Sequence, residues 1–179
     1  MSKLHNFKKD LKDSTRYYDQ SILLLNNLFN SKFRKSGLEM DKLGSDIDNS
    51  RIYIDIKDNK YDSTNMIVEW GGWTTNKANI TTYLLWITTD KVLLIDYSML
   101  RNKCIKDKNN ILASFGMFER TSVSENRTWN VQMSKVPMAY FKKCIAKDWT
   151  RTYFDNILST TITDLSGRND FAKLLLDMQ

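Results

Sequence analysis

Short apolar segments separated by polar turns run through the middle of the chain and predict a β-sheet. Residues 51–57 alternate polar and apolar side chains, which is the pattern of a half-buried strand. Residues 66–70, 83–88 and 92–96 also have strand character, and the short polar turn between the last two favours a hairpin. We therefore expect these segments to form the centre of one sheet.

Helical spacing of apolar residues is found on both sides of these strands. Residues 15–30 predict an amphipathic helix, and further helices are expected after Ser98 and from Pro137. Residues 38–43 favour a short strand or an irregular segment, and residues 149–163 fit either a helix or a strand. The pattern as a whole predicts an α/β fold, with a central mixed sheet of about five strands flanked by helices.

Charged side chains converge on the polar face of a predicted hairpin. Asn-Ser at positions 49–50 is favourable turn chemistry, and a two-residue turn there places Asp46 diagonally across from Asp55. Diagonal neighbours lie within roughly 7–8 Å, which is close enough for two carboxylates to hold one cation. Lys57 follows Asp55 on the same face. Two carboxylates and an ammonium group in this arrangement can bind a divalent metal and hold a water molecule beside it.

Two other acidic residues compete for the first position of this site. Asp48 shares a face with Asp46, because residues two apart on a strand point the same way. In the predicted register, however, Asp48 lies opposite Arg51 and farther from Asp55, so Asp46 is preferred. Glu39 is a second upstream candidate. A slip of one residue would move the whole set to the other face of the sheet.

Residue counts exclude several classes of enzyme. The single histidine, His5, lies in a polar N-terminal segment, whereas Ser-His-Asp catalysis, Cys-His catalysis and most catalytic zinc sites require histidine. Cys104 and Cys144 lie forty residues apart without a C-x-x-C spacing, so we expect neither a disulfide framework nor structural zinc, and a cytoplasmic location fits. Phosphate-binding glycine motifs are absent from the sequence. The remaining chemistry uses carboxylates, lysines and hydroxyls, which suits Mg²⁺.

Basic residues are concentrated in the second half of the chain. The formal net charge is +6, and residues 91–147 contain 11 basic and 4 acidic side chains. This excess indicates a polyanionic partner such as nucleic acid, although a solvated surface would have the same composition. No apolar run is long enough to span a membrane, so no membrane partner is expected. The candidate phosphate-contacting residues are Lys77, Arg101, Lys103, Lys106, Lys108, Lys142 and Lys143.

Asp46, eight intervening residues and Asp55-Ile56-Lys57 together resemble the signature of the PD-(D/E)XK nuclease superfamily. In that signature an acidic residue precedes Asp/Glu-X-Lys on a strand. Ser45 stands where the family usually has a proline before the first acidic residue. The resemblance covers about residues 14–115, and the order of strands and turns is similar to that of small, phage-type members. It implies a restriction-endonuclease-like core.

The resemblance also implies roles for the residues of the motif. Asp46, Asp55 and the backbone carbonyl of Ile56 would be metal ligands, and Lys57 would orient the attacking water. Asp46, Asp55 and Lys57 would thus be catalytic.

Each of two acidic residues outside the motif can be interpreted in two ways. Superfamily members often carry an acidic residue on the first helix, which makes Asp19 a further metal candidate. A solvent-facing carboxylate near the start of a helix is the preferred interpretation of Asp19. Glu69 is either a further catalytic residue that binds the metal or positions the water, or a solvent-facing strand residue.

The sequence hypothesis is therefore a single nuclease-like domain over residues 1–179. It comprises a tail (1–12), a core (14–115) and a basic and aromatic C-terminal extension (116–179). The expected activity is Mg²⁺-dependent hydrolysis of phosphodiester bonds in nucleic acid, with DNA as the expected substrate, Mn²⁺ as a substitute metal and a homodimer left open. A catalytically inactive nucleic-acid-binding or inhibitory protein on the same fold is the main alternative. A protein–protein interaction module is the other.

Overall fold

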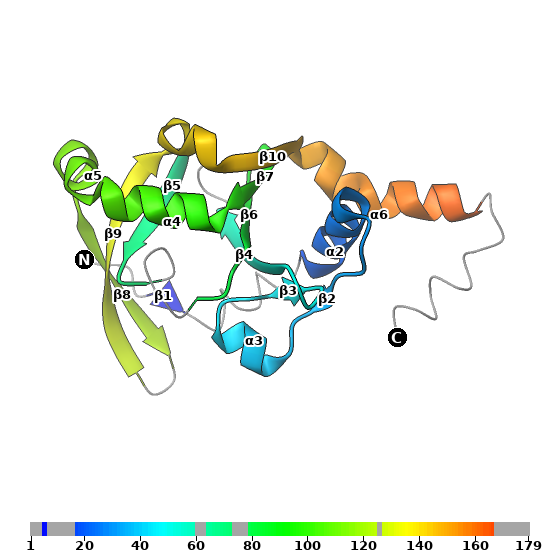
Figure 1. Ribbon diagram of the computed structural model, residues 1–179, viewed down its shortest axis with the longest axis horizontal. Helices are drawn as coiled ribbons and strands as arrows, with labels where there is room; N and C mark the ends of the chain where they lie inside the picture. Colours follow the sequence, from blue (N-terminus) through cyan, green and yellow to red (C-terminus); the bar gives the residue numbers. More distant parts are fainter. Residues whose placement is uncertain (1–4, 7–16, 60–63, 73–78, 125–126, 167–179) are drawn as a thin grey trace.

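The computed structural model describes residues 5–6, 17–59, 64–72, 79–124 and 127–166. Lys77 and most of the expected N-terminal tail lie outside the described residues. The described chain forms an α/β structure in which two β-sheets are flanked by helices (Figure 1). The fold class expected from the sequence is confirmed.

The larger sheet has six strands in the order β10-β7-β6-β4-β3-β2. Parallel pairing joins β4 to β6, and the other neighbouring pairs are antiparallel, so the sheet is mixed. The strands are β2 (Arg34–Lys35), β3 (Ile47–Asp48), β4 (Tyr53–Asn59), β6 (Tyr83–Thr88), β7 (Lys91–Asp96) and β10 (Ile145–Thr150).

The smaller sheet has four strands in the order β1-β8-β9-β5. The strands are β1 (His5–Asn6), β5 (Asn65–Trp70), β8 (Phe118–Ser124) and β9 (Arg127–Pro137). Residues 66–70 were expected in the same sheet as residues 83–88 and 92–96; this is wrong, because β5 pairs with β9 instead. Both β9 and β10 come from the part of the sequence expected to be a C-terminal extension. They pair with β5 and β7, respectively, so this part of the chain contributes strands to both sheets.

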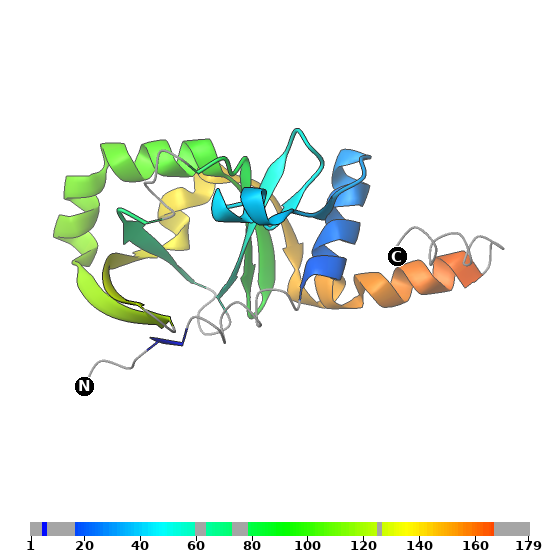
Figure 2. The same ribbon diagram turned by 90° about the horizontal axis from the view of Figure 1, so that it is seen from below.

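Helices cover the two faces of the six-stranded sheet. Figures 1 and 2 show α2 (Tyr18–Phe29) and α6 (Arg151–Ser166) on one side. On the other side lie α4 (Tyr97–Lys106), α5 (Lys108–Phe115) and the four-stranded sheet. Neither these helices nor any other in the described ranges is both long and apolar enough to cross a bilayer.

Each face of the larger sheet contributes to its own hydrophobic core, because successive side chains of a strand point in opposite directions. One core contains Ile54, Ile56, Leu85 and Leu94 together with residues of α2 and α6. The other contains Leu84, Trp86, Leu93 and Ile95 together with residues of α4, β5 and β9. The apolar–polar alternation of β4 is thus explained: its isoleucines point into the first core, and its polar residues lie on the second side.

Three local predictions were wrong or incomplete. Residues 38–43 were expected to be a short strand or an irregular segment, but α3 (Leu38–Lys42) is a short helix in which Asp41 N–H donates to the Gly37 carbonyl over 3.0 Å. The helix expected from Pro137 is a 3₁₀ segment, η1 (Met138–Cys144). The ambiguous residues 149–163 divide between the end of β10 and α6.

Candidate active site

The hairpin of β3 and β4 has a longer turn than the sequence suggested. Ile47 pairs with Ile54, so residues 49–52 form the connection and the predicted two-residue turn is wrong. The Asn49 side chain explains the difference, because its Oδ1 accepts hydrogen bonds from the N–H groups of Arg51 and Ile52 (3.1 and 2.8 Å). The register is displaced by two residues. A displacement of two keeps the paired residues Ile47 and Asp48 on their predicted faces.

Asp46 is held in a fixed position next to β4. Its backbone N–H donates to the Ile54 carbonyl over 2.8 Å, which places Asp46 beside β4, next to the Ile47–Ile54 pair. Its Oδ2 accepts from the Ile56 N–H over 2.6 Å, and its Oδ1 accepts from the Tyr18 hydroxyl over 3.1 Å. Both carboxylate oxygens of Asp46 are therefore oriented, one by the sheet and one by α2.

Asp55 is a buried carboxyl group with one unsatisfied oxygen. The residue is 3% exposed, and its Oδ1 lies 3.0 Å from the Nζ of Lys57. Its Oδ2 is buried and has no hydrogen-bond partner among the described residues. Burial raises the pKa of Asp55 from 3.8 to about 7; the Lys57 ammonium opposes this shift, and the neighbouring Asp46 carboxylate adds to it. Asp46 and Asp55 are thus close enough for the charge of one to affect the pKa of the other.

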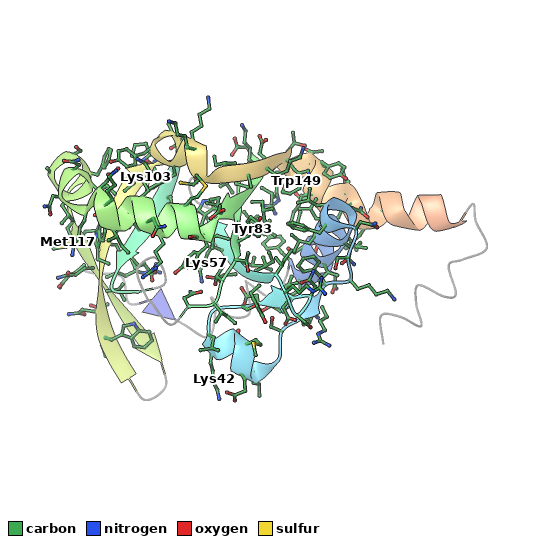
Figure 3. The ribbon with its side chains drawn as sticks, in the orientation of Figure 1. Lys42, Lys57, Tyr83, Lys103, Met117 and Trp149 are labelled. Atoms are coloured by element: carbon green, nitrogen blue, oxygen red, sulfur yellow. The ribbon has the colours of Figure 1, made fainter. Side chains whose placement is uncertain are left out.

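Lys57 completes the group and is reachable from solvent. Burial lowers the pKa of Lys57, but the charges of Asp55, Asp46 and Glu69 outweigh this effect, so its pKa is raised and it stays an ammonium ion. About a third of its side chain is exposed. In the view of Figure 3, Lys57 lies between α4 and α3. We call Asp46, Asp55 and Lys57 the carboxyl–lysine cluster.

Two further polar side chains near this cluster were not singled out by the sequence. Tyr97 is 3% exposed; burial raises its pKa to about 12, the charge of Asp55 contributes to the rise, and those of Arg101 and Lys57 oppose it. The pKa of Asp41 on α3 is raised by burial and by the charge of Asp46. Neither residue has a local sequence signal, because both reach the cluster through the packing of helices next to the sheet.

Asp48 and Glu39 do not take the position of Asp46. Asp48 is buried, but its Oδ2 accepts from the Ser36 hydroxyl (2.8 Å) and its Oδ1 from the Ser50 N–H (3.0 Å). Arg34 lies 3.8 Å from the same carboxylate. Glu39 is exposed on α3 and forms an ion pair with Lys42 at 2.8 Å. Asp48 therefore holds the hairpin turn together, and the preference for Asp46 agrees with the geometry.

Asp19 lies at the surface of α2. Its side chain is 56% exposed and its carboxylate is 3.9 Å from Lys35. The residue of α2 that contacts Asp46 is its neighbour, Tyr18. The sequence predicts this helix only as an amphipathic one and contains no signal for the contact of Tyr18 with Asp46.

Glu69 and Ile56 lie near the cluster in different ways. Glu69 is on β5, with its carboxylate close to Gly72, and its charge acts on Lys57. The Ile56 N–H points towards Asp46. Since the N–H and C=O of one strand residue point to the same side, the Ile56 carbonyl also faces the side of Asp46. This agrees with the expected backbone ligand.

The candidate phosphate-contacting residues have different environments. Arg101 on α4 is half-buried, whereas Lys106 and Lys108 are exposed. Lys103 forms an ion pair with Asp107 at 2.8 Å and lies over the ring of Tyr140. Lys142 and Lys143 are exposed in η1.

Within the described ranges, no group of three or more His, Cys, Asp or Glu side chains is arranged to hold a metal ion. The cluster supplies two carboxylates, so water molecules or substrate oxygens would have to complete the coordination of a cation. Mg²⁺ commonly keeps several water ligands and takes only one or two carboxylates from the protein.

Neither a family model, nor a curated protein, nor a solved structure matches this chain. Membership of the PD-(D/E)XK superfamily therefore remains a prediction that depends on the motif of Asp46, Asp55 and Lys57.

Proposed function

We propose that this protein is a Mg²⁺-dependent nuclease that hydrolyses phosphodiester bonds in nucleic acid, with DNA as its substrate. The carboxyl–lysine cluster would be its active site. The observation that carries the proposal is the buried Asp55 carboxyl group, whose Oδ2 has no hydrogen-bond partner among the described residues, near the oriented Asp46 carboxylate. A buried carboxylate beside a second carboxylate is unfavourable by itself, and a cation between them would remove the conflict.

Three ligands from this chain suit a hard divalent cation. They are the carboxylates of Asp46 and Asp55 and the backbone carbonyl of Ile56, all oxygen donors from two adjacent strand segments. When bound there, Mg²⁺ would polarise the scissile phosphate and lower the pKa of a water molecule.

The protein groups around the metal have separate roles in the proposed reaction. Ile56 N–H and Tyr18 orient Asp46, which keeps its carboxylate directed at the neighbouring Asp55. Lys57 stays protonated next to Asp55, so it would orient the attacking water and neutralise negative charge that develops on the phosphate. The basic side chains of α4, α5 and η1 would bind the nucleic-acid backbone, which makes binding dependent on salt.

The test compares conservative variants of the cluster with a surface control. Asp55→Asn and Lys57→Met should abolish Mg²⁺-stimulated cleavage of labelled duplex DNA and leave its salt-dependent binding in EDTA within a few-fold of wild type. Lys42→Met is the matched control, because Lys42 belongs to an exposed ion pair on α3. Figure 3 shows Lys42 on the outer side of this helix. Full activity is expected for this control.

Two outcomes would reject the proposal. One is undiminished cleavage by both cluster variants. The other is a wild-type protein that cleaves neither duplex nor single-stranded DNA at any Mg²⁺ or Mn²⁺ concentration. Salt-dependent DNA binding without turnover would instead identify a non-catalytic nucleic-acid-binding protein, and a lack of affinity for any nucleic acid would favour a protein–protein interaction module. Thermal unfolding with and without Mg²⁺ is an independent readout, since a bound metal should raise the midpoint of wild type and not that of Asp55→Asn.

A further inference from the structure

The start of α4 is tied to the strand that carries Asp55. The Tyr97 N–H donates to the carbonyl of Thr82 over 3.2 Å, and the Thr82 N–H donates to the carbonyl of Tyr53 over 2.7 Å. Tyr53 is the first residue of β4, two positions before Asp55. Two backbone hydrogen bonds therefore connect the first turn of α4 to the site.

Packing places α4 on the same side of the sheet as Asp55. Asp55 pairs with Leu84, which pairs with Ile95, and residues paired in this way share a face. Leu84 and Ile95 belong to the same core cluster as Leu100 of α4. The inward face of α4 and the carboxyl group of Asp55 thus lie on one side of the sheet.

Arg101 lies one helical turn after Tyr97 and so shares its side of α4. Burial raises the pKa of Tyr97, and the charges of Arg101, Asp55 and Lys57 also affect this pKa, which agrees with a position between α4 and the carboxyl–lysine cluster. The Nε of Arg101 is buried and has no hydrogen-bond partner among the described residues. A desolvated N–H group without an acceptor is unfavourable, and a ligand oxygen would satisfy it.

The other two cations of α4 differ from Arg101 in their surroundings. Lys103 is held by Asp107 at 2.8 Å and by the ring of Tyr140, 4.4 Å from its Nζ. Lys106 is exposed. Arg101 thus combines a position on the side of the cluster with a buried donor that no described residue satisfies.

We infer that Arg101 binds a phosphate group beside the carboxyl–lysine cluster, and that this is the phosphate at which the proposed nuclease acts. The inference depends on the proposed function for the identity of the substrate. A guanidinium group presents parallel N–H donors that match two oxygens of a phosphate, and arginine does not lose its charge when it is partly buried. Arg101 would then be a substrate-binding residue, distinct from exposed lysines that contact the backbone of nucleic acid.

The first experiment measures binding without turnover. Nitrogen-15 NMR spectra of the arginine Nε–H groups would be recorded in EDTA while the protein is titrated with a dithymidine dinucleotide that carries a 5′-terminal phosphate. The Arg101 signal is assigned by its loss in Arg101→Lys. It should move in a saturable manner in wild type and equally in Lys42→Met, the control from the exposed ion pair on α3. An Arg101 signal that stays in place at millimolar dinucleotide overturns the inference.

The second experiment measures catalysis with Mg²⁺. Arg101→Lys keeps the charge but removes the forked donor, and it should lower kcat by about 100-fold, as removal of a donor to a developing oxyanion does. Lys42→Met should keep kcat and KM within twofold, because Lys42 belongs to an exposed ion pair on α3. Circular dichroism checks that each variant is folded, and Arg101→Gln replaces Arg101→Lys if the latter is not.

These readouts separate the two claims. A moving Arg101 signal with no Mg²⁺-dependent cleavage by wild type overturns the nuclease function and leaves the phosphate subsite. Active wild type with an unchanged kcat in the folded Arg101 variant overturns the assignment of Arg101 to the reacting phosphate and leaves the nuclease function.

Discussion

The buried Asp55 predicts an unusual effect of pH on stability, which Asp55→Asn should remove. In the folded protein without metal the pKa of Asp55 is raised to about 7, mainly by burial, whereas in the unfolded chain it returns to 3.8. Between these two values the folded state binds more protons than the unfolded state, so the free energy of unfolding falls as pH rises. Below pH 3.8 the group has no effect, and above pH 7 the full loss is present.

The size of the effect follows from the shift in pKa. One pKa unit corresponds to 1.36 kcal/mol, so a shift of about three units gives an upper bound of about 4 kcal/mol. Asparagine removes the charge and keeps the shape. In EDTA at pH 8, Asp55→Asn should therefore be more stable than wild type by as much as about 4 kcal/mol, and the difference should shrink steadily towards pH 4.5.

Asp48→Asn is the matched control because Asp48 is buried in the same hairpin but is fully supported by donors. Its carboxylate accepts from Ser36 and Ser50 and lies near Arg34, so this substitution should destabilise the protein by about 1–3 kcal/mol. Urea unfolding followed by tryptophan fluorescence at pH 4.5, 6 and 8 would measure both variants. A loss of stability in Asp55→Asn at pH 8 comparable to that in Asp48→Asn would refute the reasoning.

Two further predictions concern the residues that position Asp46. Tyr18→Phe removes the 3.1 Å hydrogen bond to Asp46 and should lower the free energy of unfolding by about 0.5–1.5 kcal/mol. It should also weaken Mg²⁺ binding in a thermal-shift titration. An unchanged metal affinity would show that Tyr18 has only a structural role. Gly44→Ala should cost about 1 kcal/mol more than Gly71→Ala in the free energy of unfolding. Both glycines have positive φ angles (91° and 82°), but only at Gly44 would a Cβ meet a neighbour, the Asn79 side chain at 2.6 Å. Equal losses of unfolding free energy in the two variants would contradict this steric argument.

Asn79 matters here because it connects the segment before Asp46 to the start of β6. Its Oδ1 accepts from the Thr81 N–H over 2.7 Å, and the Ile80 N–H donates to the Leu43 carbonyl over 3.1 Å. The positive φ of Gly44 lets the backbone pass close to Asn79. No motif in the sequence points to this contact, because it joins residues more than thirty positions apart.

The sequence alone was sufficient to predict that Asp46, Asp55 and Lys57 lie close together, and the alternation of β4 put Asp55 and Lys57 on one face. Strand alternation has a period of two, so an error of two residues in the register left the faces unchanged. The apolar composition of β6 and β7 was likewise enough to identify them as buried strands. These features depend on neighbours along the chain or on a single turn.

Local sequence did not predict the length of the β3–β4 turn or the helix α3. The Asn49 side chain lengthened the turn by binding the backbone, which turn propensities at positions 49–50 did not reveal. Residues 38–43 became a helix. Its C-terminal end is joined to the start of β6 by the hydrogen bond from Ile80 to Leu43.

The environment of the cluster was decided by tertiary structure alone. Tyr18 meets Asp46 because α2 packs next to the hairpin, and Arg101 lies on the side of Asp55 because α4 returns across the sheet after β7. Burial of Asp55 results from the same packing, and burial, rather than the motif itself, gives this carboxyl group its raised pKa. A linear sequence specifies which charges lie on a strand, whereas the layers that close over the strand determine their solvation and therefore their chemistry.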